Sequence, residues 1–287
     1  MTPGPVFCMG GGGFTMEGGL PSLDAYILAL ADVHRPRVLF MPTASGDPED
    51  QIRRFGTVFG SWPCRPRILS LFQLADLGEP LEDLVLAQDI IYVGGGSMVN
   101  LLALWRAHEL PELLVEANRR GTVLAGLSAG AMCWMEGGVS RSTGKPTPVD
   151  GLGLIPGSLS VHARQAPERG VAYRAAVASG RLPSGWTADD HTGLLFVDGR
   201  LEECVASRPD AEVRRVDRAP DGSLEECPVR VRRLEPHAGG VVTDALERRA
   251  GRRAGDIDVR DELRLVNRMR GRPGRASAAR GGRRGAR

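Results

Sequence analysis

The chain has 287 residues, of which 42% are hydrophobic, and a formal net charge of +2, a composition that supports one sizeable core. It contains no run of about 18 apolar residues, and its N-terminus has no basic stretch followed by an apolar one. We therefore expect no membrane span, no signal peptide and a cytoplasmic location. Five widely spaced cysteines without a CxxC pair disfavour a disulfide framework and a zinc site, and we expect neither a metal nor a cofactor.

The charge is distributed unevenly along the chain. Residues 248–287 hold fourteen arginines against four acidic residues, and residues 236–287 contain few large apolar groups. Such a segment buries too little surface to offset its ordering entropy. We expect an α/β domain over residues 1–235 and a disordered Arg-rich tail over 236–287, and we do not expect the tail to bind nucleic acid. No self-complementary stripe stands apart from the core, so the sequence predicts no oligomeric state.

Apolar runs separated by helical stretches of about 10–15 residues predict a mainly parallel sheet with helices on both faces, a doubly wound α/β fold. The predicted strands span 5–9, 37–42, 67–71, 89–93 and 122–126. Functional loops of such a sheet lie at the carboxyl ends of the strands.

The second half of the chain gives weaker signals. Residues 139–151 are polar and rich in Ser, Pro and Gly, which predicts a surface loop, and 152–156 and 158–161 are predicted as short strands. A helix is expected over 171–178. Alternating patterns at 193–197 and 204–207 predict an antiparallel hairpin.

Glycine-rich loops follow the first and fourth predicted strands, at residues 10–13 and 94–96. Neither GxGxxG spacing nor a GKS or GKT sequence accompanies the first loop, which disfavours nucleotide binding. We interpret it as a tight turn on the substrate side.

The fifth predicted strand ends in Gly126-Leu127-Ser128-Ala129-Gly130, followed by a predicted helix over 131–135. A GxSxG sequence between a strand and a helix is typical of a nucleophile elbow, which needs small residues on either side of the serine. We predict Ser128 as a nucleophile. The N–H of Ala129 and that of Gly95 or Gly96 are the predicted donors of an oxyanion hole.

A general base is expected to be one of five histidines. His34 and His108 lie at predicted helix ends, and His237 begins the tail. The spacing leaves His162 and His191 as alternatives.

Five segments together resemble the peptidase E family of serine peptidases, over roughly residues 5–234. They read Met9-Gly10-Gly11-Gly12, Pro42-Thr43-Ala44-Ser45-Gly46, Tyr92-Val93-Gly94-Gly95-Gly96, Gly126-Leu127-Ser128-Ala129-Gly130-Ala131 and Asp150-Gly151-Leu152-Gly153-Leu154. The resemblance implies a fold like that of class I glutamine amidotransferases, and a Ser-His pair with an acidic residue. It also implies His162 as the base and short peptides, including those with an amino-terminal aspartate, as substrates.

The sequence departs from that family after the elbow, where Ser140-Arg141-Ser142 replaces Ser-Asp-Ser. We rank Asp190 first as the orienting acid, ahead of Asp189, Glu136 and Asp150. Arg141 or Arg164 is a candidate partner for a substrate carboxylate.

The missing acid leaves a second hypothesis, an inactive binding protein that keeps the fold. A third, a glutamine amidotransferase-like enzyme, is disfavoured because Cys133 would lie inside the helix after the elbow.

Overall fold

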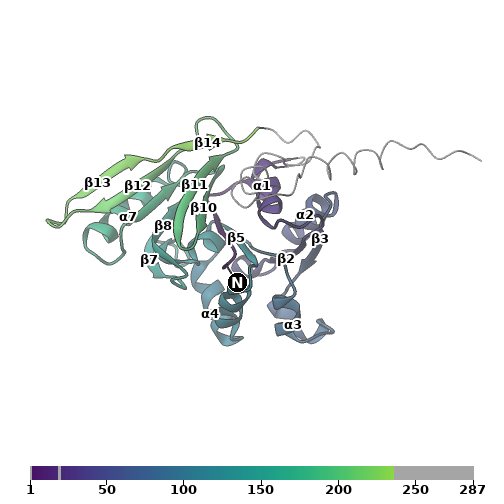
Figure 1. Ribbon diagram of the computed structural model, residues 1–287. Helices are drawn as coiled ribbons and strands as arrows, with labels where there is room; N and C mark the ends of the chain where they lie inside the picture. Colours follow the sequence, from purple (N-terminus) through teal and green to yellow (C-terminus); the bar gives the residue numbers. More distant parts are fainter. Residues whose placement is uncertain (1, 19–20, 236–287) are drawn as a thin grey trace, which may run out of the picture. The chain divides into compact units, whose positions relative to one another are not determined.

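An eight-stranded sheet combines five strands from the first half of the chain with three from residues 192–233 (Figure 1). The structure is a computed structural model that describes residues 2–18 and 21–235; the predicted tail lies outside them. In spatial order the strands are β14 (Val231–Arg233), β11 (Arg200–Ala206), β10 (Thr192–Val197), β1 (Val6–Met9), β5 (Val123–Leu127), β4 (Ile90–Val93), β2 (Arg37–Met41) and β3 (Arg65–Ile68). The neighbouring strands β1, β5, β4, β2 and β3 are parallel, as expected for a doubly wound fold. Strands β10 and β11 form the predicted antiparallel hairpin.

Helices cover both faces of this sheet. They are α1 (Ser22–Leu30), α2 (Glu49–Gly60), α3 (Leu81–Leu86), α4 (Met98–Ala107), α5 (Leu110–Arg119), α6 (Ala129–Met132) and α7 (Pro167–Ala178), of which the last belongs to the second sheet. Alternate residues of each strand enter different cores: Val6 and Cys8 of β1 pack with α3 to α6, whereas Phe7 and Met9 pack with α1 and α2. This period of two places a core on each face, which confirms the predicted doubly wound architecture.

A second, six-stranded sheet was not predicted. Its strands are, in spatial order, β13 (Leu224–Pro228), β12 (Val213–Arg218), β9 (Gly185–Ala188), β8 (Ile155–Val161), β6 (Met135–Ser140) and β7 (Thr147–Asp150). Leu159 and Trp186 of this sheet share a core with α4 and α6, and α7 packs on its other face. Helices α1 and α2 thus cover one face of the first sheet, and its other face shares a core with the second sheet. Helix α7 covers the outer face of the second sheet.

Two expectations for the segment after the elbow were wrong. The helix ends at Met132 rather than continuing to 135, and Met135 already begins β6. Residues 139–151 are not simply a loop, because they hold the end of β6 and all of β7. Gly138 of β6, directly before this segment, lies close to the neighbouring strand, since a Cβ there would lie 2.6 Å from the carbonyl oxygen of Leu159. Glycine is required where β6 and β8 approach this closely.

Candidate active site

Ser128 lies at a strained turn between β5 and α6. Its backbone has φ 53° and ψ −112°, a conformation that L-residues rarely adopt. A Cβ on Gly126 would lie 2.0 Å from the carbonyl oxygen of Gly130, and a Cβ on Gly130 would lie 2.4 Å from that of Val93. Both glycines are thus required by close backbone approach, as the elbow pattern predicted.

His162 lies opposite Ser128, directly after β8 of the second sheet. Its Nε2 is 2.9 Å from Oγ of Ser128. Its Nδ1 forms a hydrogen bond with Oδ1 of Asp190, whose side chain is only 6% exposed. Because a carboxylate only accepts hydrogen bonds, Nδ1 carries the proton, and Nε2 is left to accept the proton of the serine hydroxyl. The three side chains thus form one hydrogen-bonded chain.

The other predicted acids lie elsewhere. The Asp189 carboxylate accepts hydrogen bonds from the backbone N–H groups of Arg164 and Glu212. Glu136 is exposed and accepts a hydrogen bond from the N–H of Gly157. Asp150 is exposed and pairs with Arg181. Of the four candidates, Asp190 is the one bonded to His162.

His191, the alternative base, belongs to a different pair. Its Nδ1 lies 2.9 Å from Oε1 of Glu17, which also accepts a hydrogen bond from the hydroxyl of Ser207 at 2.8 Å. The remaining histidines lie away from the serine or outside the described residues: His34 is exposed, His108 lines a separate hollow, and His237 is not described.

The first glycine-rich loop packs between these two histidine pairs. A Cβ on Gly11 would lie 2.2 Å from Oδ1 of Asp190 and 3.1 Å from Cε1 of His162. A Cβ on Gly12, where φ is +108°, would lie 3.3 Å from Nδ1 of His191. The loop therefore lies directly against the histidine and its acid. From the sequence it had been interpreted only as a tight turn on the substrate side.

A buried carboxylate that the sequence analysis missed anchors this loop. Asp24 of α1 is fully buried and accepts hydrogen bonds from the N–H of Phe14 and the hydroxyl of Tyr92. Burial raises the pKa of Asp24 to about 7, partly offset by these two hydrogen bonds. The sequence signal was an acid in the otherwise apolar stretch 23–30.

The two oxyanion-hole candidates on the second glycine-rich loop have different neighbours. Gly95 faces the elbow, since a Cβ there would lie 3.3 Å from Cβ of Ser128. Gly96 faces Ala44 instead, whose carbonyl oxygen would lie 2.2 Å from its Cβ. The loop is fixed at both ends by hydrogen bonds from Gly94 to Met41 and from Ser97 to Ala44. Ala129 follows the serine as the first residue of α6.

Comparison with known proteins supplies the family. The model of peptidase family S51 matches residues 6–204. The chain belongs to peptidase family S51. It is 42% identical over 232 residues to the uncharacterized peptidase YgaJ of Bacillus subtilis strain 168, covering 80% of this chain and 98% of that one. The resemblance to the peptidase E family is confirmed, and the chain is a hydrolase of the peptidase class.

The fold of this S51 member is shared with solved structures. The crystal structure of a peptidase from an acI-B1 Actinobacterium matches with a TM-score of 0.59 at 21% identity, over 79% of this chain and 94% of that chain. At this identity the match shows the fold alone.

The cysteine after the elbow is not placed as a nucleophile in this S51 chain. Cys133 is fully buried at the end of α6, and its thiol donates a hydrogen bond to the carbonyl oxygen of Gly130. Burial raises the pKa of this thiol well above its ordinary value. Because the thiolate is the reactive form, this environment makes the thiol inert.

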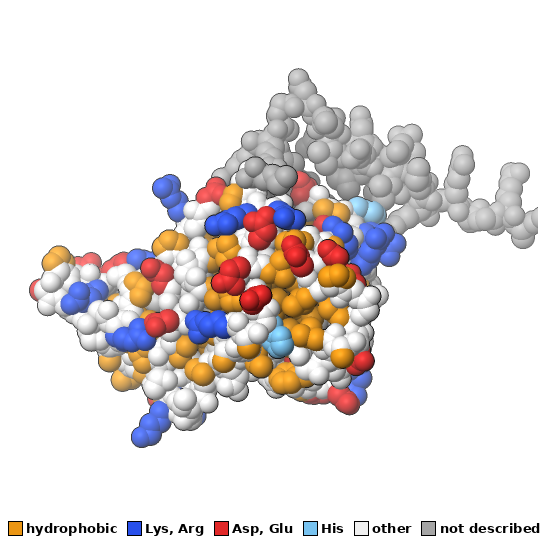
Figure 2. Space-filling model, turned by 90° about the horizontal axis from the view of Figure 1, so that it is seen from below, with side chains coloured by type: hydrophobic (Ala, Val, Ile, Leu, Met, Phe, Trp, Pro, Cys, Tyr) orange, Lys and Arg blue, Asp and Glu red, His pale blue; other side chains and the backbone are white. Residues whose placement is uncertain are grey.

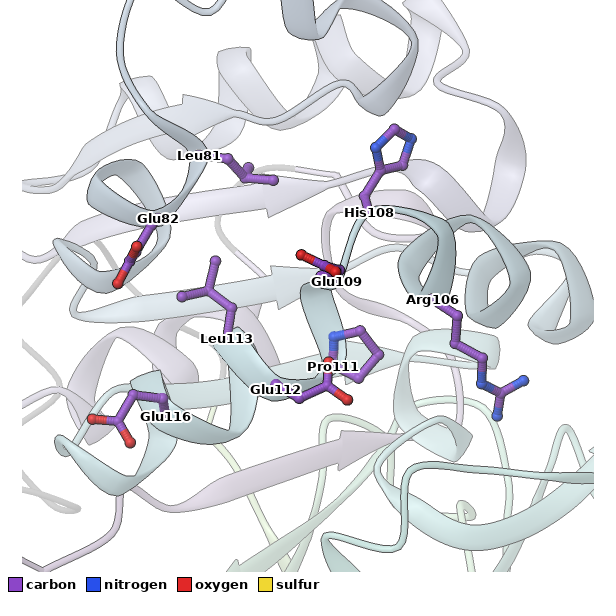
Figure 3. A pocket seen from close by; sticks show the side chains of 9 residues that line it. All are labelled: Leu81, Glu82, Arg106, His108, Glu109, Pro111, Glu112, Leu113 and Glu116. Atoms are coloured by element: carbon purple, nitrogen blue, oxygen red, sulfur yellow. The ribbon is translucent and has the colours of Figure 1, made fainter.

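Two hollows mark the surface of the S51 domain. One, of about 210 Å³, is lined by Asp190, His191, Arg208 and the loop around Asp210. The other, of about 690 Å³, lies between α3 and the turn from α4 to α5, where Glu82, Glu109 and Glu112 surround Leu81 and Leu113 (Figure 3). Figure 2 shows acidic side chains gathered around apolar surface on the side that carries α3 and α4 in Figure 1. None of the predicted site residues lines this second hollow.

Two further findings concern the described part of the chain. Within residues 2–18 and 21–235, no three His, Cys, Asp or Glu side chains are grouped so that they could hold a metal ion. None of the helices described has both the length and the apolar character that crossing a bilayer requires.

Proposed function

We propose that this peptidase is a serine peptidase that hydrolyses short peptides through an acyl-enzyme intermediate. The observation that carries the proposal is the hydrogen-bonded chain from Oγ of Ser128 through the imidazole of His162 to the buried carboxylate of Asp190. A serine hydroxyl becomes nucleophilic when a base can remove its proton as it attacks. A carboxylate on the far nitrogen fixes the tautomer and stabilises the imidazolium that forms.

The reaction follows from this arrangement. Oγ of Ser128 attacks the peptide carbonyl carbon while Nε2 of His162 takes the hydroxyl proton. The N–H groups of Ala129 and Gly95 then hold the negatively charged oxygen of the tetrahedral intermediate. The C–N bond breaks, and His162 returns the proton to the departing amine. Water then attacks the ester by the same route in reverse, which releases the carboxylic acid and restores Ser128.

The arginines first considered for substrate recognition are already paired. Arg141 forms an ion pair with Glu168, and Arg164 forms ion pairs with Asp189 and Asp210. An arginine held by acids offers little free charge to a substrate carboxylate.

We assign that role instead to Arg169 of α7. It is half-buried, its Nη1 reaches the carbonyl oxygen of Val161 next to His162, and its Nε has no hydrogen-bond partner in the described part of the chain. Burial and the nearby Arg141 lower the pKa of Arg169 from its ordinary value. A carboxylate on the residue before the scissile bond would compensate this desolvated cation.

The two alternative functions lose their main support. The inactive binding protein rested on the acid missing at Arg141, and Asp190 reaches His162 from the turn after β9. The glutamine amidotransferase-like enzyme needs a reactive thiol near the elbow, and Cys133 is fully buried, which raises the pKa of its thiol.

Hydrolysis of a panel of Asp-Xaa, Glu-Xaa and Ala-Xaa dipeptides tests the proposal. The wild type is expected to cleave at least one class, Ser128→Ala to cleave none, and the exposed control Ser61→Ala to match the wild type. Cleavage that persists in Ser128→Ala, or a wild type inactive on every peptide, would contradict it. Arg169→Gln is expected to raise KM for the acidic class only; an equal effect in Arg208→Gln but not in Arg169→Gln would move the carboxylate site to the smaller hollow.

A further inference from the structure

Asp189, the residue before the acid of the site, bridges two strand ends. Its Oδ1 accepts the N–H of Arg164 at 3.0 Å, and its Oδ2 accepts the N–H of Glu212 at 3.1 Å. Its own N–H donates to the carbonyl oxygen of Glu212 at 3.0 Å. One carboxylate therefore connects backbone on both sides of β9.

The strand order shows which segments this bridge connects. Strand β9 lies between β8, which is parallel to it, and β12, which is antiparallel. The Arg164 N–H belongs to the turn that begins with His162 at the end of β8, and Glu212 directly precedes β12. Asp190 follows Asp189 in the turn after β9. The bridge therefore joins the segment that carries the histidine to the turn that carries its acid.

The bridging carboxylate is shielded from water. The Asp189 side chain is 7% exposed, and Nη2 of Arg164 lies 3.2 Å from its Oδ2. Burying a carboxylate without hydrogen-bond donors costs free energy, so these hydrogen bonds are strongly favoured in the folded chain. The outer partner of Arg164, Asp210, is 72% exposed and pairs with the guanidinium at 3.1 Å.

We propose that Asp189 is a positioning residue, which holds His162 and Asp190 in register and does not touch the substrate. The role rests on the proposed function of the Ser128, His162 and Asp190 chain. Without the bridge, the turn after β8 keeps the hydrogen bond from the N–H of Ala163 to the carbonyl oxygen of Ala188 but loses its link to Glu212. The position of Nε2 of His162 relative to the serine hydroxyl is then less firmly fixed. Misplacement of a reacting group by about 1 Å costs on the order of 100-fold in rate, whereas substrate affinity depends on other side chains. The expected signature is a fall in kcat with little change in KM.

Four variants test the role. Asp189→Ala removes the whole bridge, and Asp189→Asn keeps one acceptor for the two backbone donors, so kcat is expected to fall by about 100-fold in the first and less in the second. Arg164→Gln keeps its backbone N–H but removes the guanidinium from the buried carboxylate, so kcat is expected to fall less than in Asp189→Ala. Asp210→Asn touches only the exposed ion pair and is expected to stay within about threefold of the wild type. Thermal unfolding of each variant verifies that it folds, and Asp189→Asn carries the test if Asp189→Ala does not.

A second readout separates this proposal from the proposed function. The Nδ1 proton of His162, held by Asp190, is expected to give a downfield proton NMR signal in the wild type, and this readout needs no substrate. We expect the signal to broaden or vanish in Asp189→Ala and Asp189→Asn, and to persist in Asp210→Asn. A wild type that cleaves no peptide but shows this pattern of signals would overturn the proposed serine peptidase function and leave the positioning role intact. Unchanged kcat and an unchanged signal in both Asp189 variants would overturn the positioning role.

Discussion

Val161 of β8 lies opposite Ala188 of β9, and each is the last residue of its strand in a parallel pair. The carboxyl ends of neighbouring parallel strands meet at one edge, so the residues that follow are brought together. His162 follows the first strand, and Asp190 lies two residues beyond the second. This register explains how the acid reaches the histidine when the segment after the elbow supplies an arginine.

Asp190→Asn is expected to lower kcat by on the order of 10⁴-fold, because the amide no longer fixes the productive tautomer of His162. Asp150→Asn and Glu136→Gln change exposed acids outside the hydrogen-bonded chain and serve as controls. Steady-state kinetics on a cleaved dipeptide provides the measurement. A similar loss in either control would argue against Asp190 as the orienting acid.

Gly11→Ala is expected to lower kcat, whereas Gly18→Ala is expected to leave kcat unchanged. The new methyl group at position 11 would lie 2.2 Å from Oδ1 of Asp190, whereas position 18 has nothing within 4 Å. Displacing the carboxylate from His162 should reduce kcat by on the order of 100-fold. Kinetics of the two variants, with their melting temperatures, distinguish this local effect from general unfolding.

The glycines of the second loop are expected to respond differently to alanine. At Gly95 the methyl group meets the Leu127 side chain at 2.7 Å and Cβ of Ser128 at 3.3 Å, which should shift the N–H donor and lower kcat by about 100-fold. At Gly96 it meets the Ala44 carbonyl oxygen at 2.2 Å with φ at +143°, so stability should fall.

Gly94→Ala is the control for the loop, since its closest contact of 3.4 Å is ordinary. Urea unfolding and kcat are measured on all three variants. Unchanged kcat in a folded Gly95→Ala would remove Gly95 from the oxyanion hole.

The sequence predicted β1, β2, β4 and β5 because they are continuous apolar runs, and β10 and β11 because their residues alternate. It placed β3 at 67–71 instead of Arg65–Ile68, where two of the four residues are arginines, and it did not predict β14. The second sheet was missed for a physical reason. Three of the six residues of β12 are arginines and two of the five residues of β13 are glutamates, so both strands have few apolar residues, and β6 contains paired glycines. Neither pattern carries the periodicity from which a strand is inferred.

The elbow was predictable because a local pattern, GxSxG after a strand, fixes the position of Ser128. The choice between His162 and His191 needed the family resemblance, since both follow short strands. The choice of Asp190 over Asp189 depends on the direction of two adjacent side chains at a turn. Long-range register decides that direction, and a single sequence does not encode it locally.

Asp24→Asn is expected to change how stability depends on pH. The pKa of Asp24 is about 7 in the folded chain against an ordinary value near 3.8, so between these values the folded state holds a proton that the unfolded state has lost. Its contribution to stability is fully present below about pH 4 and is lost as pH rises through about 7. The loss amounts to roughly 1.4 kcal/mol per pH unit in that window.

Asparagine resembles the protonated acid and does not titrate, so wild type should lose stability relative to Asp24→Asn from pH 5 to pH 8. Urea unfolding of both proteins at pH 5, 6, 7 and 8 measures the difference. Curves that stay parallel across this range would show that Asp24 is not protonated in the fold.

The most direct test of the account is the reaction of the full chain with a fluorophosphonate, followed by mass spectrometry of the peptide that carries the adduct. The account predicts one adduct on Ser128 in the wild type, none in Ser128→Ala, and strongly slowed labelling in His162→Ala. No labelling of the wild type, an adduct on a residue other than Ser128, or an unchanged rate in His162→Ala would contradict it.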